Sequence, residues 1–229
     1  MIKFYYAPAP NPAKVALFLE EAALAYELVP IDTMKGDQFT PAFKSVNPNC
    51  KVPALVDGDV VIFDSNAILQ YLGETTGRFM PAPGSPRARG ELLSWLAFVG
   101  TGVGPYSGQA VHFKRFAQEK IPYAINRYHV EAQRHWGILE ERLSARRYML
   151  GESYTIVDMA VWGWARAIGY VFDGDFWATL PSVKRLFDEI SARPAAQRAM
   201  ALATRHQFKT DIDADARRNL FPQNSRLDS

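Results

Sequence analysis

The chain has little of the chemistry that would let it act through its own thiols or through a metal ion. Cys50 is the one cysteine among 229 residues. A single cysteine excludes an internal disulfide framework and any Cys-x-x-Cys motif for redox chemistry or zinc. The 4 histidines show no metal-ligand spacing, and no Ser-His-Asp order stands out. We therefore expect no metal site.

The chain also lacks a large excess of positive or negative charge, and it lacks long hydrophobic runs. The net charge is +2 and no long basic run is present, which removes the electrostatic case for a nucleic-acid partner. No apolar stretch reaches the roughly 20 residues that a bilayer span needs. Met1 to Tyr6 reads as a strand and lacks a signal-peptide layout. We expect a cytoplasmic protein that engages neither nucleic acid nor a membrane.

The first part of the chain alternates strand and helix patterns. Hydrophobic residues make up 48% of the sequence, enough for a large core in one large or two small domains. Period and turn chemistry predict strands at Ile2 to Tyr6, Tyr26 to Ile31, Ala54 to Val56 and Val60 to Ile62, with helices from Ala13, from Phe39 to Val46 and from Asp64 to Thr76. This order predicts a mixed sheet with helices on it.

The composition then changes. Met80 to Pro86 is rich in Pro and Gly and indicates an interdomain linker. Every patterned segment beyond it is helical: Arg87 to Arg115, Pro122 to Ser144, Thr155 to Gly169, Ser182 to Ser191 and Pro194 to Ala203. From Asp211 onward the chain is polar and weakly patterned. We therefore divide it into an α/β domain at 1–79, a linker at 80–86, an all-α domain at 87–205 and a tail at 206–229.

Two short motifs in the α/β part point to a ligand site. Val52-Pro53 stands between a polar turn and a strand, so it is a candidate cis bond. A cis bond there would leave the Val52 N–H and C=O free to pair with an extended, peptide-like ligand. Asp64-Ser65 opens a helix with Ser65 placed like its N-cap, and a helix N-terminus binds carboxylates. Together the motifs suit a zwitterionic small peptide.

Each motif has a plain structural interpretation when taken alone. A Val-Pro pair is most often the start of a strand, and Asp-Ser before a helix is most often only a cap. Their joint occurrence, with the strand signals in order around them, favours the ligand site.

Two further motifs in the helical part are interpreted as structural. Thr155-x-x-Asp158 matches a capping box, with Tyr154 and Met159 placed as its hydrophobic staple. Gly100 to Pro105 superficially suggests a phosphate loop, but it follows a helical run and not a strand. We interpret it as a break in a long helix, where small residues widen a cleft for a second substrate.

With these motifs in place, the sequence resembles a glutathione transferase of the cytosolic type over roughly Ile2 to Ala203. The resemblance implies a thioredoxin-like N-terminal domain that carries the Val-Pro and acid-Ser motifs, and an all-α C-terminal domain that carries the capping box. It also implies glutathione, reduced or as the disulfide, as cosubstrate, with no metal.

Several stretches are similar to the bacterial nu class. These are Phe4 to Asn11 (FYYAPAPN), Leu17 to Ala22 (LFLEEA), Lys35 to Phe39 (KGDQF) and Ile121 to Tyr128 (IPYAINRY). That class reduces disulfides such as 2-hydroxyethyl disulfide, and many members show modest peroxidase or conjugating activity. Its members are homodimers in which an arginine matching Arg127 reaches the glutathione site of the other subunit.

Glutathione chemistry needs a thiolate, and an unperturbed cysteine thiol has a pKa of about 8.5. A hydrogen bond to a charged acceptor contributes roughly 1.5–3 kcal/mol, so one donor can lower that pKa by about one to two units. The turn from Ala7 to Pro12 has neither Ser nor Cys, which excludes a cysteine-dependent mechanism. The resemblance makes Asn11 the donor, with Tyr6 as runner-up; Ala9 stands where the nu pattern usually has Thr.

The resemblance also assigns the remaining contacts. Ser65 and Asp64 take the γ-glutamyl carboxylate and ammonium, and the backbone at Val52-Pro53 pairs with the cysteinyl unit. Gln38 and Lys51 are candidates for the glycyl carboxylate, and for Lys51 simple solvent exposure is an equal alternative. The residues expected to line the second-substrate pocket are Ala9, Tyr106, His112, Trp164 and Phe208. Cys50 is interpreted as incidental.

The leading hypothesis is a glutathione-dependent enzyme that carries out thiol–disulfide exchange. The second is a conjugating transferase, peroxidase or ether-cleaving lyase that acts on a hydrophobic electrophile with the same glutathione residues. The third is a non-catalytic binding module of the same fold. The sequence leaves the second substrate and the role of the tail open.

Overall fold

Four strands form one mixed sheet in the order β2-β1-β3-β4 in the computed structural model, which describes residues 1–227. They are β1 (Ile2–Tyr6), β2 (Tyr26–Pro30), β3 (Ala54–Asp57) and β4 (Val60–Phe63). β1 runs parallel to β2 and antiparallel to β3, and β3 pairs antiparallel with β4. Parallel neighbours need a crossover, and helix α1 (Pro10–Glu21) supplies it.

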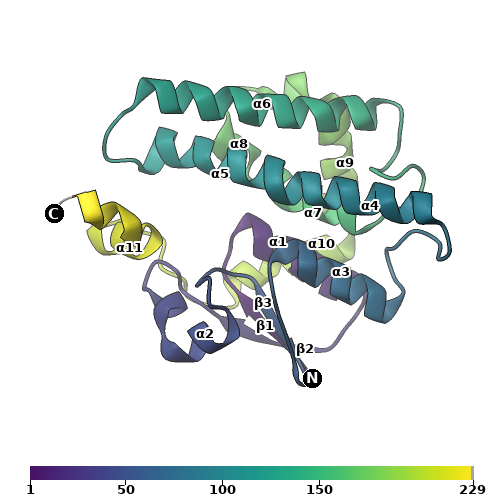
Figure 1. Ribbon diagram of the computed structural model, residues 1–229, viewed down its shortest axis with the longest axis horizontal. Helices are drawn as coiled ribbons and strands as arrows, with labels where there is room; N and C mark the ends of the chain where they lie inside the picture. Colours follow the sequence, from purple (N-terminus) through teal and green to yellow (C-terminus); the bar gives the residue numbers. More distant parts are fainter. Residues whose placement is uncertain (228–229) are drawn as a thin grey trace.

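The two faces of the sheet are covered by different helices. Side chains alternate along a strand, so Phe4 and Tyr6 face α1 and α3 (Ser65–Thr76) in the main core. Tyr5 faces the other way, toward Phe43 of the short helix α2 (Pro41–Val46). Figure 1 shows α1 and α3 lying between the sheet and the helical half of the chain.

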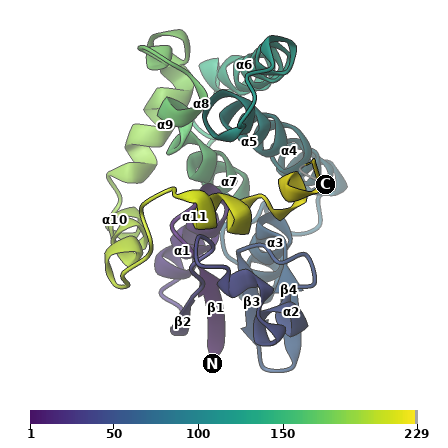
Figure 2. The same cartoon turned by 90° about the vertical axis from the view of Figure 1, so that its left-hand side faces the viewer.

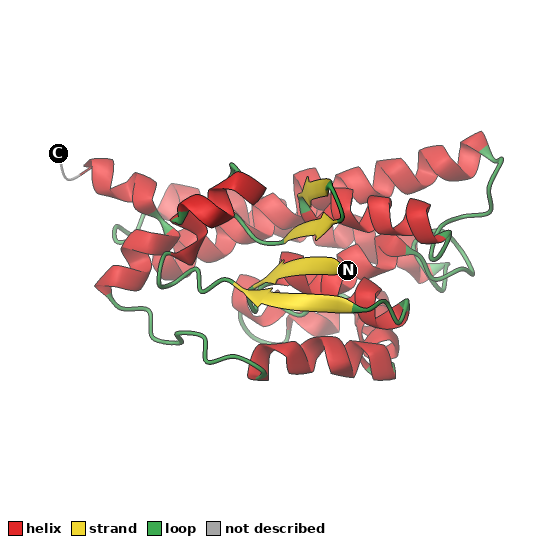
Figure 3. Cartoon of the chain, turned by 90° about the horizontal axis from the view of Figure 1, so that it is seen from below, coloured by secondary structure: helices red, strands yellow, loops and turns green. Residues whose placement is uncertain are grey.

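The helical half is built around α7 (Ile156–Ala165), which is buried at nearly every position. A helix that is apolar all round belongs inside a core, and α7 packs against α1, α3 and α4. The other helices are α4 (Pro86–Phe98), α5 (Gly104–Val111), α6 (Pro122–Ser144), α8 (Ile168–Val171), α9 (Pro181–Ser191), α10 (Pro194–Ala201) and α11 (Ala214–Leu220). Viewed from below, the strands lie side by side in front of this helical layer (Figure 3).

The expected fold class is confirmed, as are the order of the elements and the bounds of α6. Two element predictions are wrong. The helix predicted from Thr155 to Gly169 is two helices, because α7 ends at Ala165 and α8 starts at Ile168. Helix α1 starts at Pro10 and not at Ala13, since proline suits the first helical position.

The glycine-rich segment before Pro105 is a π-helical turn, Val99–Val103, between α4 and α5, so the predicted break in a long helix is confirmed. The expectation that its small residues widen a cleft is wrong. A Cβ on Gly102 would lie 2.4 Å from His135, and one on Gly100 would lie 2.7 Å from Asn66. These glycines instead admit side chains from neighbouring helices.

The C-terminal segment is more regular than its sequence pattern indicated. It forms α11 and a 3₁₀ turn (Pro222–Leu227) and crosses the face of the molecule between the sheet domain and the helical domain (Figure 2). Asn219 Nδ2 donates to Met34 O, and Arg217 donates to Phe116 O. The segment therefore bridges both halves. The last two residues of the predicted 206–229 tail lie outside the described residues.

The predicted capping box is confirmed at the start of α7. Asp158 Oδ2 accepts from the Thr155 N–H at 2.8 Å and the Thr155 hydroxyl at 3.0 Å, and Oδ1 accepts from the Met149 N–H at 2.7 Å. Burial raises the pKa of Asp158 to about 6, although these hydrogen bonds work in the opposite direction. The carboxylate thus holds the loop before α7 as well as the helix end.

Replacing Asp158 with alanine is expected to destabilise the protein strongly. Three buried donors would lose their acceptor, and each unsatisfied group costs about 1–3 kcal/mol, so the free energy of unfolding should fall by roughly 3 kcal/mol or more. Asp188→Ala is the control, because Asp188 is 56% exposed and pairs with Lys184 on the same helix; its effect should stay under about 0.5 kcal/mol. Urea denaturation measures both, and equal effects would contradict this role of Asp158.

Candidate active site

Asn11 lies in the first turn of α1, directly after the turn that leaves β1. Its Oδ1 accepts a hydrogen bond from Trp164 Nε1 of α7 at 3.0 Å. An indole N–H can only donate, so the carbonyl end of the amide must face Trp164. The Nδ2 end is thereby left to donate elsewhere. The predicted donor residue thus has its orientation fixed from the helical domain.

Ala9 is the N-cap of α1 and offers no side-chain cap. A helix start normally leaves several N–H groups without partners. Here Pro10 and Pro12 have no N–H, and the Ala13 N–H bonds to Ala9 O at 3.2 Å. Few donors therefore need a cap, which explains how alanine is accommodated. It also leaves the Asn11 amide as the side-chain donor of this turn.

Tyr6, the runner-up donor, is 2% exposed and packs between Phe4 and Phe208. Burial raises its pKa, which the nearby Arg166 partly offsets. This environment is that of a core tyrosine at the end of β1. The buried position of Tyr6 therefore favours Asn11 as the donor to the thiolate.

The Val52-Pro53 peptide bond is cis, as the sequence suggested. It stands just before β3, and Pro53 is buried while Val52 is partly exposed. The N–H and C=O of Val52 take no hydrogen-bond partner among residues 1–227. They are therefore available to an extended ligand alongside the sheet domain.

The cap of α3 differs from the expectation. Asp64, not Ser65, is the N-cap: its Oδ1 accepts from the Asn66 N–H at 2.9 Å and the Ala67 N–H at 3.2 Å. Asp64 has φ of 73° and is exposed, with one carboxylate oxygen engaged in the cap. Ser65 is the first helical residue, and its side chain is buried at the helix N-terminus.

Lys14 was not singled out from the sequence, yet it joins the two predicted parts of the site. It lies one helical turn beyond Asn11, is 1% exposed, and its Nζ donates to Ser65 Oγ at 3.2 Å and to Asn66 Oδ1 at 3.3 Å. The signal was present, since Lys14 is a lone charge within the apolar run Ala13 to Leu19. A lysine so deeply buried is uncommon unless it is paired.

Gln38 does not point a free donor at the site. Its Nε2 donates to Thr33 O at 3.1 Å and to Asn219 O of the C-terminal segment at 2.9 Å. Both amide hydrogens are used, so Gln38 can reach a glycyl carboxylate only if one of these contacts is released. Lys51 is exposed on the loop before Val52.

A cavity of about 490 Å³ lies beside the turn that carries Ala9. It contains three of the predicted second-substrate residues, Ala9, His112 and Trp164, together with Arg166, Tyr170 and Phe221. The tail contributes directly, because the Phe221 ring packs 4.6 Å from that of His112. The cavity therefore brings together three of the five predicted pocket residues, and the C-terminal segment forms part of its wall.

Two predicted pocket residues lie elsewhere. Tyr106 stacks on His135 with ring centroids 4.8 Å apart, on the α6 side of α5. Phe208 packs on Tyr6 at the end of the sheet. Neither residue lines the cavity beside Ala9. The prediction failed because the direction in which a side chain points cannot be fixed from sequence spacing alone.

Arg166 is a second residue that the sequence did not reveal. It lies at the C-terminal end of α7 and lines the cavity next to Ala9. Burial lowers its pKa from the usual value, and its contacts within the described chain are the Trp162 ring and the electrostatic influence of Tyr6. A guanidinium without an acidic partner makes this apolar pocket attractive to an anion.

Arg127, predicted to reach a partner subunit, lies on α6 and is 52% exposed. It pairs with Glu131 at 3.1 Å on the same helix. Figure 1 shows α6 on the side of the helical domain that faces away from the sheet. Arg127 is therefore not part of the site of its own chain.

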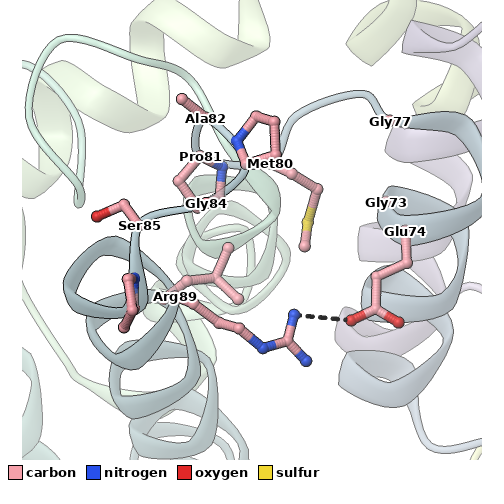
Figure 4. Close-up of a pocket in the computed structure, with 12 residues that line it drawn as sticks. Gly73, Glu74, Gly77, Met80, Pro81, Ala82, Gly84, Ser85 and Arg89 are labelled. Carbon is pink, nitrogen blue, oxygen red and sulfur yellow. Dashed lines mark hydrogen bonds and ion pairs between the residues drawn. The ribbon is translucent and has the colours of Figure 1, made fainter.

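A larger hollow of about 580 Å³ lies at the predicted linker. Figure 4 shows Met80 to Ser85 curving around it, with the Arg89–Glu74 ion pair at its side. It contains none of the predicted site residues. We place the candidate active site at the smaller cavity, where Ala9 and Trp164 meet.

The described residues contain neither a candidate metal centre nor a membrane-spanning helix. Within residues 1–227, no group of three His, Cys, Asp or Glu side chains is placed to hold a metal ion. No helix in that range is long and apolar enough to cross a membrane.

Comparison with known proteins identifies this arrangement. The family model for the glutathione S-transferase N-terminal domain matches residues 1–74, and that for the C-terminal domain matches residues 108–194. The chain belongs to the glutathione S-transferase family.

Individual relatives of this transferase cover nearly its whole length. It is 41% identical over 218 residues to disulfide-bond oxidoreductase YfcG of Escherichia coli strain K12, covering 92% of this chain and all of the relative. It is 36% identical to YghU of the same organism, over 86% of this chain and 73% of the relative.

Solved structures of glutathione transferases share this fold. A glutathione transferase from Burkholderia graminis, with two glutathione molecules bound per subunit, is 36% identical and superposes with a TM-score of 0.83 over 90% of this chain and 89% of its own. A transferase from Pseudomonas putida, with one glutathione disulfide bound per subunit, is 33% identical with a TM-score of 0.80, over 87% and 90%.

Proposed function

We propose that the protein is a glutathione-dependent disulfide reductase of the nu-class type. The observation that carries this is the Asn11 amide, which Trp164 orients so that Nδ2 can donate to a glutathione thiolate. The disulfide-bond oxidoreductases among its relatives and the glutathione-bound structures support the same reaction. Glutathione is then the cosubstrate, and no metal takes part.

The reaction balances with thiols from glutathione alone. A first thiolate, stabilised by Asn11, attacks one sulfur of the disulfide and releases a substrate thiol, leaving a mixed disulfide. A second glutathione thiolate attacks the glutathione sulfur of that mixed disulfide, releasing the second substrate thiol and glutathione disulfide. Cys50 has no part in this sequence, since it lies on the loop before Lys51 and outside the cavity beside Ala9.

The glutathione backbone would lie across the Val52-Pro53 segment, with its γ-glutamyl end at α3. The unpaired N–H and C=O of Val52 suit the cysteinyl unit. The Ser65 N–H and hydroxyl at the start of α3 suit the carboxylate, since Asp64 already caps the Asn66 and Ala67 N–H groups, and the exposed Asp64 carboxylate suits the ammonium. Lys51 and Gln38 remain candidates for the glycyl carboxylate, and Gln38 would first have to release its bond to Thr33 O or to Asn219 O.

The second substrate is proposed to be a disulfide that carries a carboxylate. The cavity beside Ala9 is mostly apolar, with Arg166 as a cation that lacks an acidic partner in residues 1–227. Conjugation of a hydrophobic electrophile is the alternative for the same cavity, and the aromatic walls from Trp164, Tyr170 and Phe221 favour it.

A homodimer is also proposed, with Arg127 of one chain at the glutathione site of the other. The support is that Arg127 is half exposed on a helix remote from its own site. A non-catalytic binding module of this fold is the remaining alternative, and it predicts that no glutathione-dependent turnover will be found.

Asn11→Asp tests the proposed reaction. The variant keeps an oxygen for Trp164 but replaces the donor by an anion, so kcat/KM for 2-hydroxyethyl disulfide should fall roughly 10- to 150-fold, the equivalent of about 1.5–3 kcal/mol. Binding of S-methylglutathione, which has no thiol, should change little. An unchanged reductase rate would exclude Asn11 as the donor.

The same assay separates the candidate functions. We expect the wild-type protein to turn over 2-hydroxyethyl disulfide faster than a chloronitroarene or an organic peroxide. The reverse order would favour the conjugating enzyme, and no turnover with any of them would favour the binding module.

Arg166→Gln tests the proposed anion preference. A charged hydrogen bond contributes roughly 1.5–3 kcal/mol, so kcat/KM for dithiodiglycolate, a dicarboxylate, should fall about tenfold or more. The neutral 2-hydroxyethyl disulfide should lose less than about twofold, because it makes no ion pair with the guanidinium. Equal losses for the two disulfides would mean that Arg166 does not select charge.

Arg127→Glu tests the shared site. Its matched control is Arg134→Glu, because Arg134 lies on the same helix, is also 52% exposed and also pairs with Glu131. Charge reversal at 127 should weaken glutathione binding by about tenfold or more, and the control should not. Calorimetry gives the affinity, and sedimentation gives the oligomeric state. A monomeric wild-type protein would contradict the dimer.

A further inference from the structure

Lys14 of α1 lies between α7 and the start of α3. Its stem runs past Gly163 of α7, where a Cβ would lie 2.4 Å from Lys14 Cγ. Its Nζ ends at Ser65 Oγ and Asn66 Oδ1 of α3. Asn66 is held in turn, because its Nδ2 donates to Leu96 O of α4 at 2.8 Å. The ammonium group is therefore fixed beneath the N-terminus of α3.

The charge of Lys14 is poorly compensated in the unliganded chain. Both hydrogen-bond acceptors are neutral oxygens. Asp64 is the charged group that faces it from α3, but its carboxylate caps the helix and is exposed. On the opposite side of Lys14, α7 presents Gly163. From α4, the group near the site is the Leu96 carbonyl that bonds Asn66, so neither helix adds a titratable group. Burial lowers the pKa of Lys14 to about 7, with Asp64 opposing the shift.

The hydrogen bond from Lys14 to Ser65 determines the direction in which the serine hydroxyl can donate. An ammonium group can only donate, so Ser65 Oγ is the acceptor and its own hydrogen must lie elsewhere. Ser65 is the first residue of α3, so its hydroxyl lies at the helix N-terminus. A carboxylate at that end would accept a hydrogen bond from the serine hydroxyl and lie one hydroxyl away from the buried cation.

We propose that Lys14 is a positioning residue for the γ-glutamyl carboxylate of glutathione, acting through Ser65, and that carboxylate binding makes Lys14 take up a proton. This rests on the proposed use of glutathione. The protonated lysine holds Ser65 as a donor toward the ligand. The bound carboxylate supplies the negative charge that the buried ammonium lacks, so each stabilises the other.

The direction of the pH dependence follows from this linkage. In the free protein the pKa of Lys14 is about 7, and the bound carboxylate raises it. Affinity should be constant well below pH 7 and should fall as the pH rises from 7 toward the pKa of the bound state. At pH 8 only about a tenth of the free lysines carry a proton, so binding there should take up most of one proton from the buffer.

Calorimetry with S-methylglutathione tests the proposal on the full chain. This ligand keeps the γ-glutamyl group but has no thiol that could release a proton. Titration at pH 8 in phosphate and in Tris gives the number of protons taken up from the difference in binding enthalpy. We expect more than half a proton for the wild-type protein and an affinity about tenfold higher at pH 7 than at pH 9.

Lys14→Met is the decisive variant, because methionine fills the same space without a charge. It should bind S-methylglutathione at least about tenfold more weakly, lose the affinity difference between pH 7 and pH 9, and show only the small proton uptake of the ligand amine. Its melting temperature without ligand should not fall, since an apolar group replaces an uncompensated buried charge. A purely structural lysine would lower the melting temperature and leave the proton uptake unchanged.

The outcomes separate this proposal from the one on which it rests. Equal proton uptake in the wild-type protein and in Lys14→Met, or equal affinities, overturns the role of Lys14 while glutathione binding stands. No heat with S-methylglutathione and none with glutathione overturns both proposals. Ser65→Ala adds a further check: it keeps Lys14 but removes the hydroxyl, and its affinity should fall as in Lys14→Met.

Discussion

The close approach of α1 and α7 at Gly163 is the contact on which the candidate site depends. Because Gly163 has no side chain, the Pro10 carbonyl and the Lys14 stem can lie against α7 at distances that a Cβ would prevent. The next residue, Trp164, then reaches Asn11 and fixes its amide. The same approach therefore orients the proposed thiol donor and seats the buried lysine. The helical domain thus shapes the proposed thiol-binding end of the site as well as the proposed pocket for the second substrate.

Much of the fold could be predicted from sequence, because its signals are local. Alternation, turn residues and helical periodicity each act over a few residues, and they located the strands, α6 and the capping box at Thr155. The errors arose where distant packing decided the outcome. The glycines before Pro105 were read as open space, but His135 and Asn66 fill that space from other helices. The tail looked unpatterned because it is held by contacts with Met34 and Phe116, remote in sequence.

The candidate site divides in the same way. The cis bond at Val52-Pro53 and the helix start at Asp64-Ser65 stand in short motifs that could be read from the chain, although the cap residue is Asp64 and not Ser65, and Asn11 was assigned through the resemblance. The sequence shows Lys14 only as a lone charge in an apolar run, and it does not single out Arg166, since the importance of both lies in being buried or lining a cavity without an acidic hydrogen-bond partner. That property exists only after the domains pack together. Gln38 was recognised, but its contact with the Asn219 carbonyl joins residues 181 apart and no local pattern encodes it.

The two ends of the site differ in how their binding energy is organised. At α3 Asp64 already caps the Asn66 and Ala67 N–H groups, so the proposed carboxylate site relies on the Ser65 N–H and hydroxyl with the Lys14 ammonium behind them, and these favourable terms add together. At α1 two prolines remove backbone donors and Ala9 brings no hydroxyl, so the thiolate depends mainly on one amide. Loss of a single donor should therefore reduce chemistry far more than binding. The Trp164 bond gains its importance here, because without it the Asn11 amide could turn its carbonyl toward the thiolate and repel it.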